Sequence, residues 1–167
     1  LLNQEKQLGF QEQEDYLNFT APNARILLVD DNEMNLKVAA GLLAPIEMQI
    51  DMAENGKKAL QMLKSQQYHL VFMDHMMPIM DGIEATQCLR EMDGEYFKNV
   101  PVIALTANAV AGAKEMFQKA GMNDFVAKPI ELKEICAKIK YWLPKELIQK
   151  QTKTMEATTT EDSLEIE

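Results

Sequence analysis

Acidic, hydroxyl and basic side chains occur at intervals along this chain, each directly after a short run of apolar residues. Asp30 and Asp31 follow one run, Asp74 follows a second, Thr106 a third and Lys128 a fourth. Clustered carboxylates repel one another unless a cation neutralises them, and their hard oxygens select Mg²⁺. A lysine ammonium pairs with a phosphoryl oxygen, and a carboxylate can act as a nucleophile that forms an acyl phosphate. Together these residues predict phosphoryl chemistry assisted by a divalent cation.

Each residue type suits one part of that chemistry. Asp74 is a competent nucleophile, Thr106 can donate a hydrogen bond to a phosphoryl oxygen, and Lys128 can neutralise developing charge. One of Asp30 and Asp31 could instead cap the helix that follows, and this reading stays open for one of the two. Lys128 stands between an apolar run and Pro129, which favours a fixed turn of the kind that a cis peptide bond can make.

The segments that would position these residues alternate between strands and helices. Apolar runs of strand length lie at 26–29, 48–52, 70–73, 102–105 and 125–127, and helical stripes at 36–43, 56–63, 85–92, 113–120 and 132–139. The run 48–52 alternates with polar residues, as in an edge strand, and Gly121 follows the fourth stripe as a helix C-cap. Strict alternation predicts an α/β fold with a parallel sheet and helices on both faces. In such sheets ligands bind beyond the carboxyl ends of the strands, which is where all five polar residues fall.

Length and charge exclude several classes of protein. The 167 residues suffice for one domain, and the net charge of −9 repels a phosphate backbone, so this piece is not expected to bind nucleic acid directly. No apolar run is long enough to span a bilayer, so no membrane contact is expected. Residues 1–24 carry a net −3 and residues 151–167 a net −4. Cys88 and Cys136 lie on helical stripes, where buried reduced thiols are expected, and favour a cytoplasmic location.

Four motifs resemble the receiver domain of two-component response regulators, in that family's order and over roughly residues 24–146. They are Val29-Asp30-Asp31-Asn32, Met73-Asp74-His75-Met76-Met77-Pro78-Ile79-Met80-Asp81-Gly82, Ala104-Leu105-Thr106-Ala107 and Ala127-Lys128-Pro129. The resemblance implies a flavodoxin-like (CheY-like) five-stranded parallel sheet with strand order 2-1-3-4-5. Residues 1–23 are then expected to be an N-terminal linker, and residues 147–167 a C-terminal tail or linker.

The resemblance also implies a role for each site residue. Asp74 is similar to the phosphoacceptor, which takes a phosphoryl group from a phosphohistidine. Asp31, Asp74 and the backbone carbonyl of Met76 resemble direct Mg²⁺ ligands, and Asp30 acts mainly through water. Thr106 and Lys128 match the residues that contact the phosphoryl group.

A conformational switch is implied as well. In the family the threonine moves toward the phosphate, and an aromatic residue swings inward behind it. Thr106 and Phe125 occupy these positions, although the reading of Phe125 as an ordinary core residue stays open. By the same resemblance, the face formed by residues 109–143 (helix 4, strand 5 and helix 5 of the fold) is expected to be the readout surface and a possible dimer contact.

The surroundings of the motifs favour a hybrid sensor histidine kinase as the parent, and a free-standing regulator stays open as the alternative. Asn32, Asn35 and Ala107-Asn108-Ala109 are similar to receivers attached to such kinases, and a first residue of Leu1 suggests a piece of a longer chain. No GxxxxGK phosphate loop is present, so this piece is not expected to use ATP. We expect it to catalyse only its own phosphorylation and dephosphorylation. A histidine kinase or a histidine phosphotransfer domain is the expected donor, and the parent could be anchored in a membrane.

Two other functions were weighed from the residues. A Mg²⁺-dependent phosphatase with an aspartate nucleophile needs a second aspartate two residues later, where this chain has Met76. A flavodoxin-like cofactor site needs a glycine- and hydroxyl-rich loop where Asp30 and Asp31 stand. We expect His75 to lie at the surface and His69 to have a structural role, rather than either being a phosphodonor.

Overall fold

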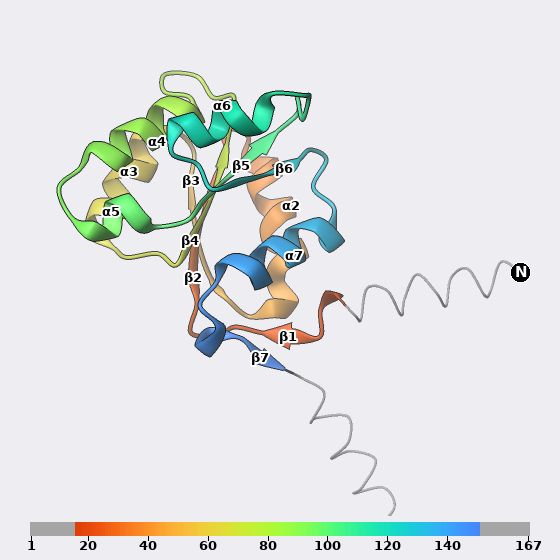
Figure 1. Ribbon diagram of the computed structural model, residues 1–167. Coiled ribbons are helices and arrows are strands. Elements are labelled where there is room, and N and C mark those ends of the chain that lie inside the picture. Colours follow the sequence, from red (N-terminus) through yellow and green to blue (C-terminus); the bar gives the residue numbers. More distant parts are fainter. Residues whose placement is uncertain (1–15, 151–167) are drawn as a thin grey trace, which may run out of the picture.

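The computed structural model describes residues 16–150, and its centre is a five-stranded parallel sheet (Figure 1). The strands are β2 (Arg25–Val29), β3 (Gln49–Ala53), β4 (Leu70–Asp74), β5 (Val102–Thr106) and β6 (Asp124–Ala127). Their order in the sheet is β3-β2-β4-β5-β6, and every neighbouring pair is parallel. In chain order this is 2-1-3-4-5, so the predicted fold and the position of the edge strands are confirmed.

Helices cover both faces of the sheet (Figure 1). They are α2 (Glu33–Leu43), α3 (Gly56–Ser65), α4 (Gly82–Glu91), α5 (Glu95–Asn99), α6 (Ala113–Ala120) and α7 (Leu132–Trp142), with 3-10 turns at Ala44–Ile46 and Lys145–Leu147. The first core lies between the sheet and the helices α2 and α7, and the second between the sheet and α3, α4 and α6. Leu27 and Leu28 are both buried but belong to different cores. Burial on both faces explains why the central strands read as continuous apolar runs.

A short antiparallel ribbon joins the two ends of the described chain. β1 (Phe19–Thr20) pairs with β7 (Gln149–Lys150), and both lie in segments expected from the sequence to be linkers. Phe19 is 1% exposed in the first core, and the Lys140 Nζ lies 4.9 Å from the centre of its ring. A strand of two residues is too short to show a periodic pattern, so β1 and β7 could not be predicted from the sequence. Ordered structure therefore extends past residues 24 and 146, whose role as domain limits stays a prediction.

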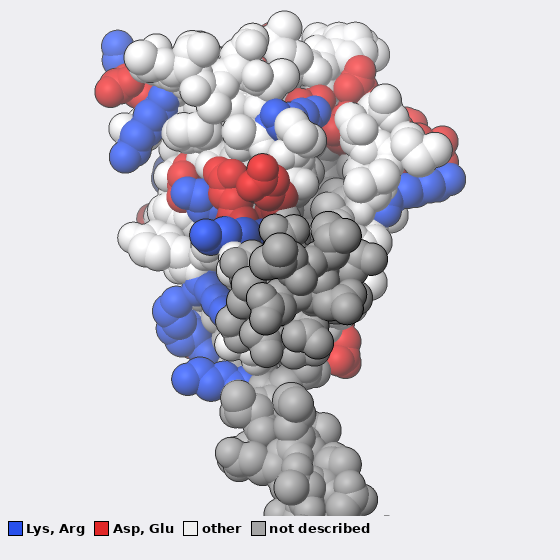
Figure 2. All heavy atoms as spheres, turned by 90° about the vertical axis from the view of Figure 1, so that its right-hand side faces the viewer, with Lys and Arg blue, Asp and Glu red and all other residues white. Residues whose placement is uncertain are grey.

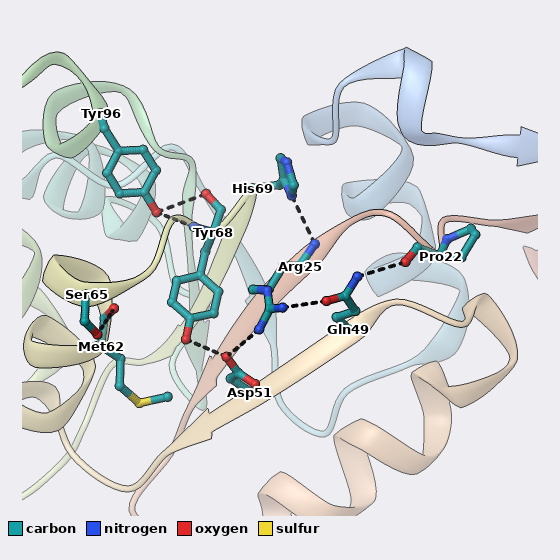
Figure 3. A network of polar contacts seen from close by, with 9 residues as sticks. All are labelled: Pro22, Arg25, Gln49, Asp51, Met62, Ser65, Tyr68, His69 and Tyr96. Carbon is teal, nitrogen blue, oxygen red and sulfur yellow. Dashed lines mark hydrogen bonds and ion pairs between the residues drawn. The ribbon is translucent and has the colours of Figure 1, made fainter.

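A polar network closes the end of the sheet where the strands begin (Figure 3). The Tyr68 hydroxyl donates to Asp51 Oδ2 at 2.6 Å, and Arg25 Nη1 lies 3.4 Å from the same oxygen. The Tyr96 hydroxyl, from the unpredicted helix α5, donates to the Tyr68 carbonyl at 3.0 Å. The His69 Nδ1 accepts the Arg25 backbone N–H at 3.0 Å, which agrees with a structural role for this histidine. Burial, together with the hydrogen bond to Asp51, raises the pKa of Tyr68, so its hydroxyl remains a donor.

The Arg90 side chain of α4 connects three segments of the chain beside the second core. Its guanidinium donates to the Gly121 carbonyl at 3.0 Å, to the Phe97 carbonyl at 2.9 Å and to Asn123 Oδ1 at 3.0 Å. Gly121 caps α6 with a φ of 98°, as predicted. A Cβ at this position would stand 2.8 Å from Arg90 Cγ, so a glycine is needed for the close approach as well as for the backbone angle.

Replacing Arg90 with methionine should lower the free energy of unfolding by about 2–3 kcal/mol, because three acceptors lose their donor. Urea denaturation followed by circular dichroism measures this change. Lys64→Met, on the last turn of α3 and exposed, is the matched control and should change stability by less than about 0.5 kcal/mol. Equal effects of the two substitutions would contradict the role given to Arg90.

Candidate functional site

Three carboxylates gather where β2 and β4 end. One oxygen from each of Asp30, Asp31 and Asp74 lies within 4.8 Å of the others. Asp30 is 3% and Asp74 5% exposed, while Asp31 faces solvent. Two ligand oxygens of a six-coordinate Mg²⁺ lie roughly 3–4 Å apart, given metal–oxygen distances of about 2.1 Å. The cluster is therefore compact enough to hold one such ion.

The turn after β2 fixes the buried member of this cluster. The Asp30 backbone N–H continues the sheet by donating to the Ala53 carbonyl at 3.1 Å. The carboxylate of Asp30 accepts the Asn32 backbone N–H at 2.9 Å and the side-chain amide of Asn35 at 3.3 Å. Asn32 itself caps α2, accepting from the backbone N–H groups of Met34 and Asn35. The cap is thus Asn32, and neither Asp30 nor Asp31 is used for it.

Lys128 brings β6 to the same point. Its Nζ lies 2.8 Å from Asp74 Oδ1 and 3.2 Å from Asp30 Oδ2, and it forms an ion pair with both. Its backbone N–H donates to the Thr106 carbonyl at 2.8 Å, and the peptide bond to Pro129 is cis, as the sequence favours. Burial alone would lower the pKa of Lys128, but the hydrogen bond to Asp74 and the charges of Asp74 and Asp30 raise it, so the ammonium stays charged.

The electrostatics of Asp74 are set by burial and crowding. Burial raises the pKa of this carboxyl, and the charges of Asp30 and Asp31 raise it further. The hydrogen bond and the charge of Lys128 oppose that rise without cancelling it. The site therefore carries excess negative charge that a bound cation would neutralise.

Thr106 ends β5, next to β4, and Phe125 lies on β6, where it pairs with Ala104 of β5. Thr106 is 1% exposed, and its Oγ1 accepts the Asn108 backbone N–H at 3.1 Å, which leaves its own proton free to be donated. Phe125 is half-buried on β6. The side chain of Met76, two residues past Asp74, is exposed, and its carbonyl as a metal ligand stays a prediction.

Three features of the site were missed or misjudged from the sequence. Gly82 packs so closely on the Asp74 carbonyl oxygen that a Cβ would clash with it, and only the bare motif hinted at this. His75, which was expected to lie at the surface, is half-buried. Its Nδ1 is buried and its ring stands edge-on to Phe117, while its backbone N–H donates to the Leu105 carbonyl at 2.8 Å and so continues the pairing of β4 with β5. The contact of the Asn35 amide with Asp30 was not predicted. The one sequence signal for it is that Asn35 lies in the first turn of α2, close behind the acids.

An acidic trio and a lysine at the carboxyl ends of a five-stranded parallel sheet define a receiver-type module. A family model, the response regulator receiver domain, matches residues 26–140, which is more than half of the chain. The chain belongs to the response regulator receiver domain family.

Known relatives agree with this assignment. The signal transduction histidine-protein kinase BarA of Escherichia coli is 40% identical over 106 residues, covering 64% of this chain and 11% of that protein. The sensor histidine kinase GacS of Pseudomonas protegens is 35% identical over 132 residues, covering 78% of this chain and 14% of that protein. The chain therefore spans little more than a tenth of these curated relatives.

Solved structures are similar over most of their own length. The receiver domain of a Pseudomonas aeruginosa sensor histidine kinase, with a magnesium ion coordinated in its active-site cleft, is 36% identical with a TM-score of 0.65, covering 71% of this chain and 96% of that one. The receiver domain of a Saccharomyces cerevisiae response regulator, crystallised with a histidine phosphotransfer protein, is 28% identical with a TM-score of 0.66. The match covers 74% of this chain and 90% of that one. This chain is accordingly a receiver domain of phosphorelay signalling, and the phosphatase alternative is not supported.

Replacing Asp74 with asparagine should stabilise the protein in the absence of divalent cations. The folded-state pKa of Asp74 lies above its unfolded value, so folding is penalised increasingly as the pH rises through the folded-state pKa, and the penalty disappears at lower pH. We expect the thermal midpoint to rise by roughly 2–4 °C at neutral pH, corresponding to about 1 kcal/mol, and by less at pH 4.

The exposed carboxylate Asp93 supplies the control, since Asp93→Asn should leave the midpoint unchanged at both pH values. Added Mg²⁺ should reduce the difference in thermal midpoint between the wild type and Asp74→Asn. An ion held by three carboxylates stabilises the wild-type fold more than an ion held by the two that remain in the variant. Scanning calorimetry at the two pH values measures both effects. A lower midpoint for Asp74→Asn at neutral pH would contradict the electrostatic account.

Proposed function

We propose that Asp74 accepts a phosphoryl group from a phosphohistidine, with Mg²⁺ bound by the acidic trio. The observation that carries this proposal is the position of Lys128 Nζ, in contact with both Asp74 and Asp30. In the transfer, an Asp74 carboxylate oxygen forms a bond to phosphorus while the bond from phosphorus to the donor imidazole nitrogen breaks. That nitrogen keeps the electron pair and takes a proton from solvent, so no other reactant is needed.

The residues of the chain contribute position and charge. Asp30, Asp31, Asp74 and the Met76 carbonyl would hold the Mg²⁺, which supplies charge neutralisation for the phosphoryl oxygens when bound. Lys128 would pair with one phosphoryl oxygen, leaving its contact with Asp30 in place. No side chain that could activate water for repeated turnover stands two residues past Asp74, which favours a phosphoacceptor over an enzyme acting on external substrates.

An apolar groove beside the site suits a protein donor. It is lined by Asp30, Asn35, Val38, Lys128, Pro129 and Ile130. Met34 and Val38 of α2 are 65% and 55% exposed and stand four residues apart, so they lie side by side on one face of the helix. A histidine kinase or a histidine phosphotransfer domain could cover these residues and present its phosphohistidine to Asp74.

The response to phosphorylation would pass through Thr106 and Phe125 to the face formed by α6, β6 and α7. There Asp124 accepts from Lys138 and from the Trp142 indole at 2.9 and 3.0 Å, while Tyr141 is 70% exposed. We propose this face as the surface for readout or dimer formation. Figure 2 shows a compact acidic group with basic atoms to its left and below it. Direct binding to nucleic acid is not proposed, because the net charge of −9 repels a phosphate backbone.

The setting proposed for this module is a cytoplasmic part of a hybrid histidine kinase. Cys88 and Cys136 are free thiols, as expected in a reducing compartment, and burial raises the pKa of Cys136 to about 11. Among residues 16–150, no helix is long and apolar enough to cross a membrane. A membrane anchor elsewhere in the parent is compatible with the proposal.

Incubation with acetyl phosphate and Mg²⁺ should add one phosphoryl group, detectable by intact mass. We expect no adduct on Asp74→Asn or after chelation of the metal, and a rate at least about tenfold lower for Lys128→Met. Lys138→Met removes an ammonium that pairs with Asp124 instead, and should react as the wild type does. An adduct that persists on Asp74→Asn would overturn the assignment.

The donor-docking role of α2 can be separated from the chemistry. The double substitution Met34→Ser and Val38→Ser should slow transfer from a phosphorylated histidine phosphotransfer protein about tenfold or more, because two apolar contacts are lost. Phosphorylation by acetyl phosphate should be unchanged. Met52→Ser, at an exposed methionine on the edge strand β3, is the control. If the double variant reacted equally slowly with the phosphotransfer protein and with acetyl phosphate, the substitutions would be disturbing the reactive site, and the docking role of α2 would be contradicted.

A further inference from the structure

Three rings form a continuous path from the residue after Asp74 to strand β6. The His75 and Phe117 ring centres lie 5.1 Å apart with an interplanar angle of 88°, an edge-to-face contact. The Phe117 and Phe125 centres lie 5.9 Å apart at 41°. Both separations fall in the range where aromatic rings attract one another. The path therefore connects the end of β4, through α6, to the aromatic residue of the proposed switch.

The first ring of this path is attached to a fixed piece of backbone. The His75 N–H donates to the Leu105 carbonyl at 2.8 Å, and the His75 carbonyl accepts the Gly82 N–H at 3.0 Å. These bonds tie the residue to β5 on one side and to the start of α4 on the other. A shift of the Asp74–His75 peptide therefore changes where the imidazole meets Phe117.

The middle ring can pass on such a change because it has no free space. Phe117 is 1% exposed in the second core, whereas Phe125 is only half-buried. A packed interior transmits small displacements instead of absorbing them. The path thus has a beginning at His75 that the backbone holds, a buried centre at Phe117 and an end at Phe125 that is only half-buried.

One nitrogen of the His75 imidazole lacks a hydrogen-bond partner in this arrangement. Within residues 16–150, the Nδ1 of His75 is the one buried side-chain nitrogen or oxygen that lacks a hydrogen-bond partner. An unpaired buried polar atom destabilises the arrangement that contains it. The observed packing of the three rings is therefore one that a rearrangement could relieve.

We propose that His75 is a positioning residue that couples the phosphorylation state of Asp74 to the position of Phe125 through Phe117. The inference rests on the proposed function, because it takes Asp74 as the phosphoacceptor. It goes further by giving a route for the signal through two side chains, neither of which touches the phosphoryl group. His75 therefore acts in the response and not in the transfer.

Fluorine NMR tests this coupling directly. The six phenylalanines are replaced by 4-fluorophenylalanine, the Phe125 resonance is assigned with Phe125→Leu, and its chemical shift is recorded before and after treatment with acetyl phosphate and Mg²⁺. We expect Phe117→Leu and His75→Leu to reduce the phosphorylation-dependent shift at least twofold, while intact mass still shows one phosphoryl group. His75→Phe, which keeps a ring in place, should retain most of the shift.

Phe19→Leu is the matched control, since Phe19 is equally buried but lies in the first core, and it should leave the shift unchanged. A full shift in both His75→Leu and Phe117→Leu, or equal losses in His75→Phe and His75→Leu, would overturn the coupling. A phosphorylated wild type whose Phe125 does not shift would overturn it as well. Absence of any adduct on the wild type would instead contradict the proposed function. If His75→Leu does not fold, Phe117→Leu and His75→Phe still decide between these outcomes.

Discussion

The contact of the Lys128 ammonium with Asp30 and Asp74 is the interaction on which the rest of the site depends. It joins the ends of β2, β4 and β6, so it crosses the sheet from one side of its centre to the other. Without a positive charge at this point, the nearly buried carboxylates of Asp30 and Asp74 would repel each other, and Asp31 nearby would add to that repulsion. The fold can place these acids together because Lys128 compensates part of their repulsion, and the remainder creates an affinity for a divalent cation.

The parallel sheet makes this convergence possible. All five strands run in the same direction, so residues far apart in the chain reach one edge simply by following their strands. The helices on both faces bury the central strands completely and give the edge a rigid base. Asn32 then caps α2 directly after the acids, so the connection after β2 is short, whereas the longer loops 75–81 and 107–112 follow β4 and β5.

Regular features of the fold were predictable from the sequence, and irregular ones were not. The buried strands and the helical stripes have clear periods, and Asp30, Asp74 and Lys128 could be placed together because each directly follows a strand. The ribbon at Phe19 and Lys150 is too short to have a period, and the partial burial of His75 depends on its contact with Phe117, 42 positions further along the chain, which no local pattern records. For the same reason the exposure of Met34 and Val38 was not foreseen, since a helical stripe indicates which face is buried but not how far a neighbour extends over it.

The ribbon also determines how this module can be linked to others. Because Phe19 is paired with Lys150, the chain enters and leaves the domain at neighbouring points. The segment after β1 leads directly into the start of β2, and β7 follows the end of α7, so both points lie at the opposite end of the sheet from Asp74. The two attachment points of the described domain are therefore a single place on its surface, and the acidic edge is left clear of both.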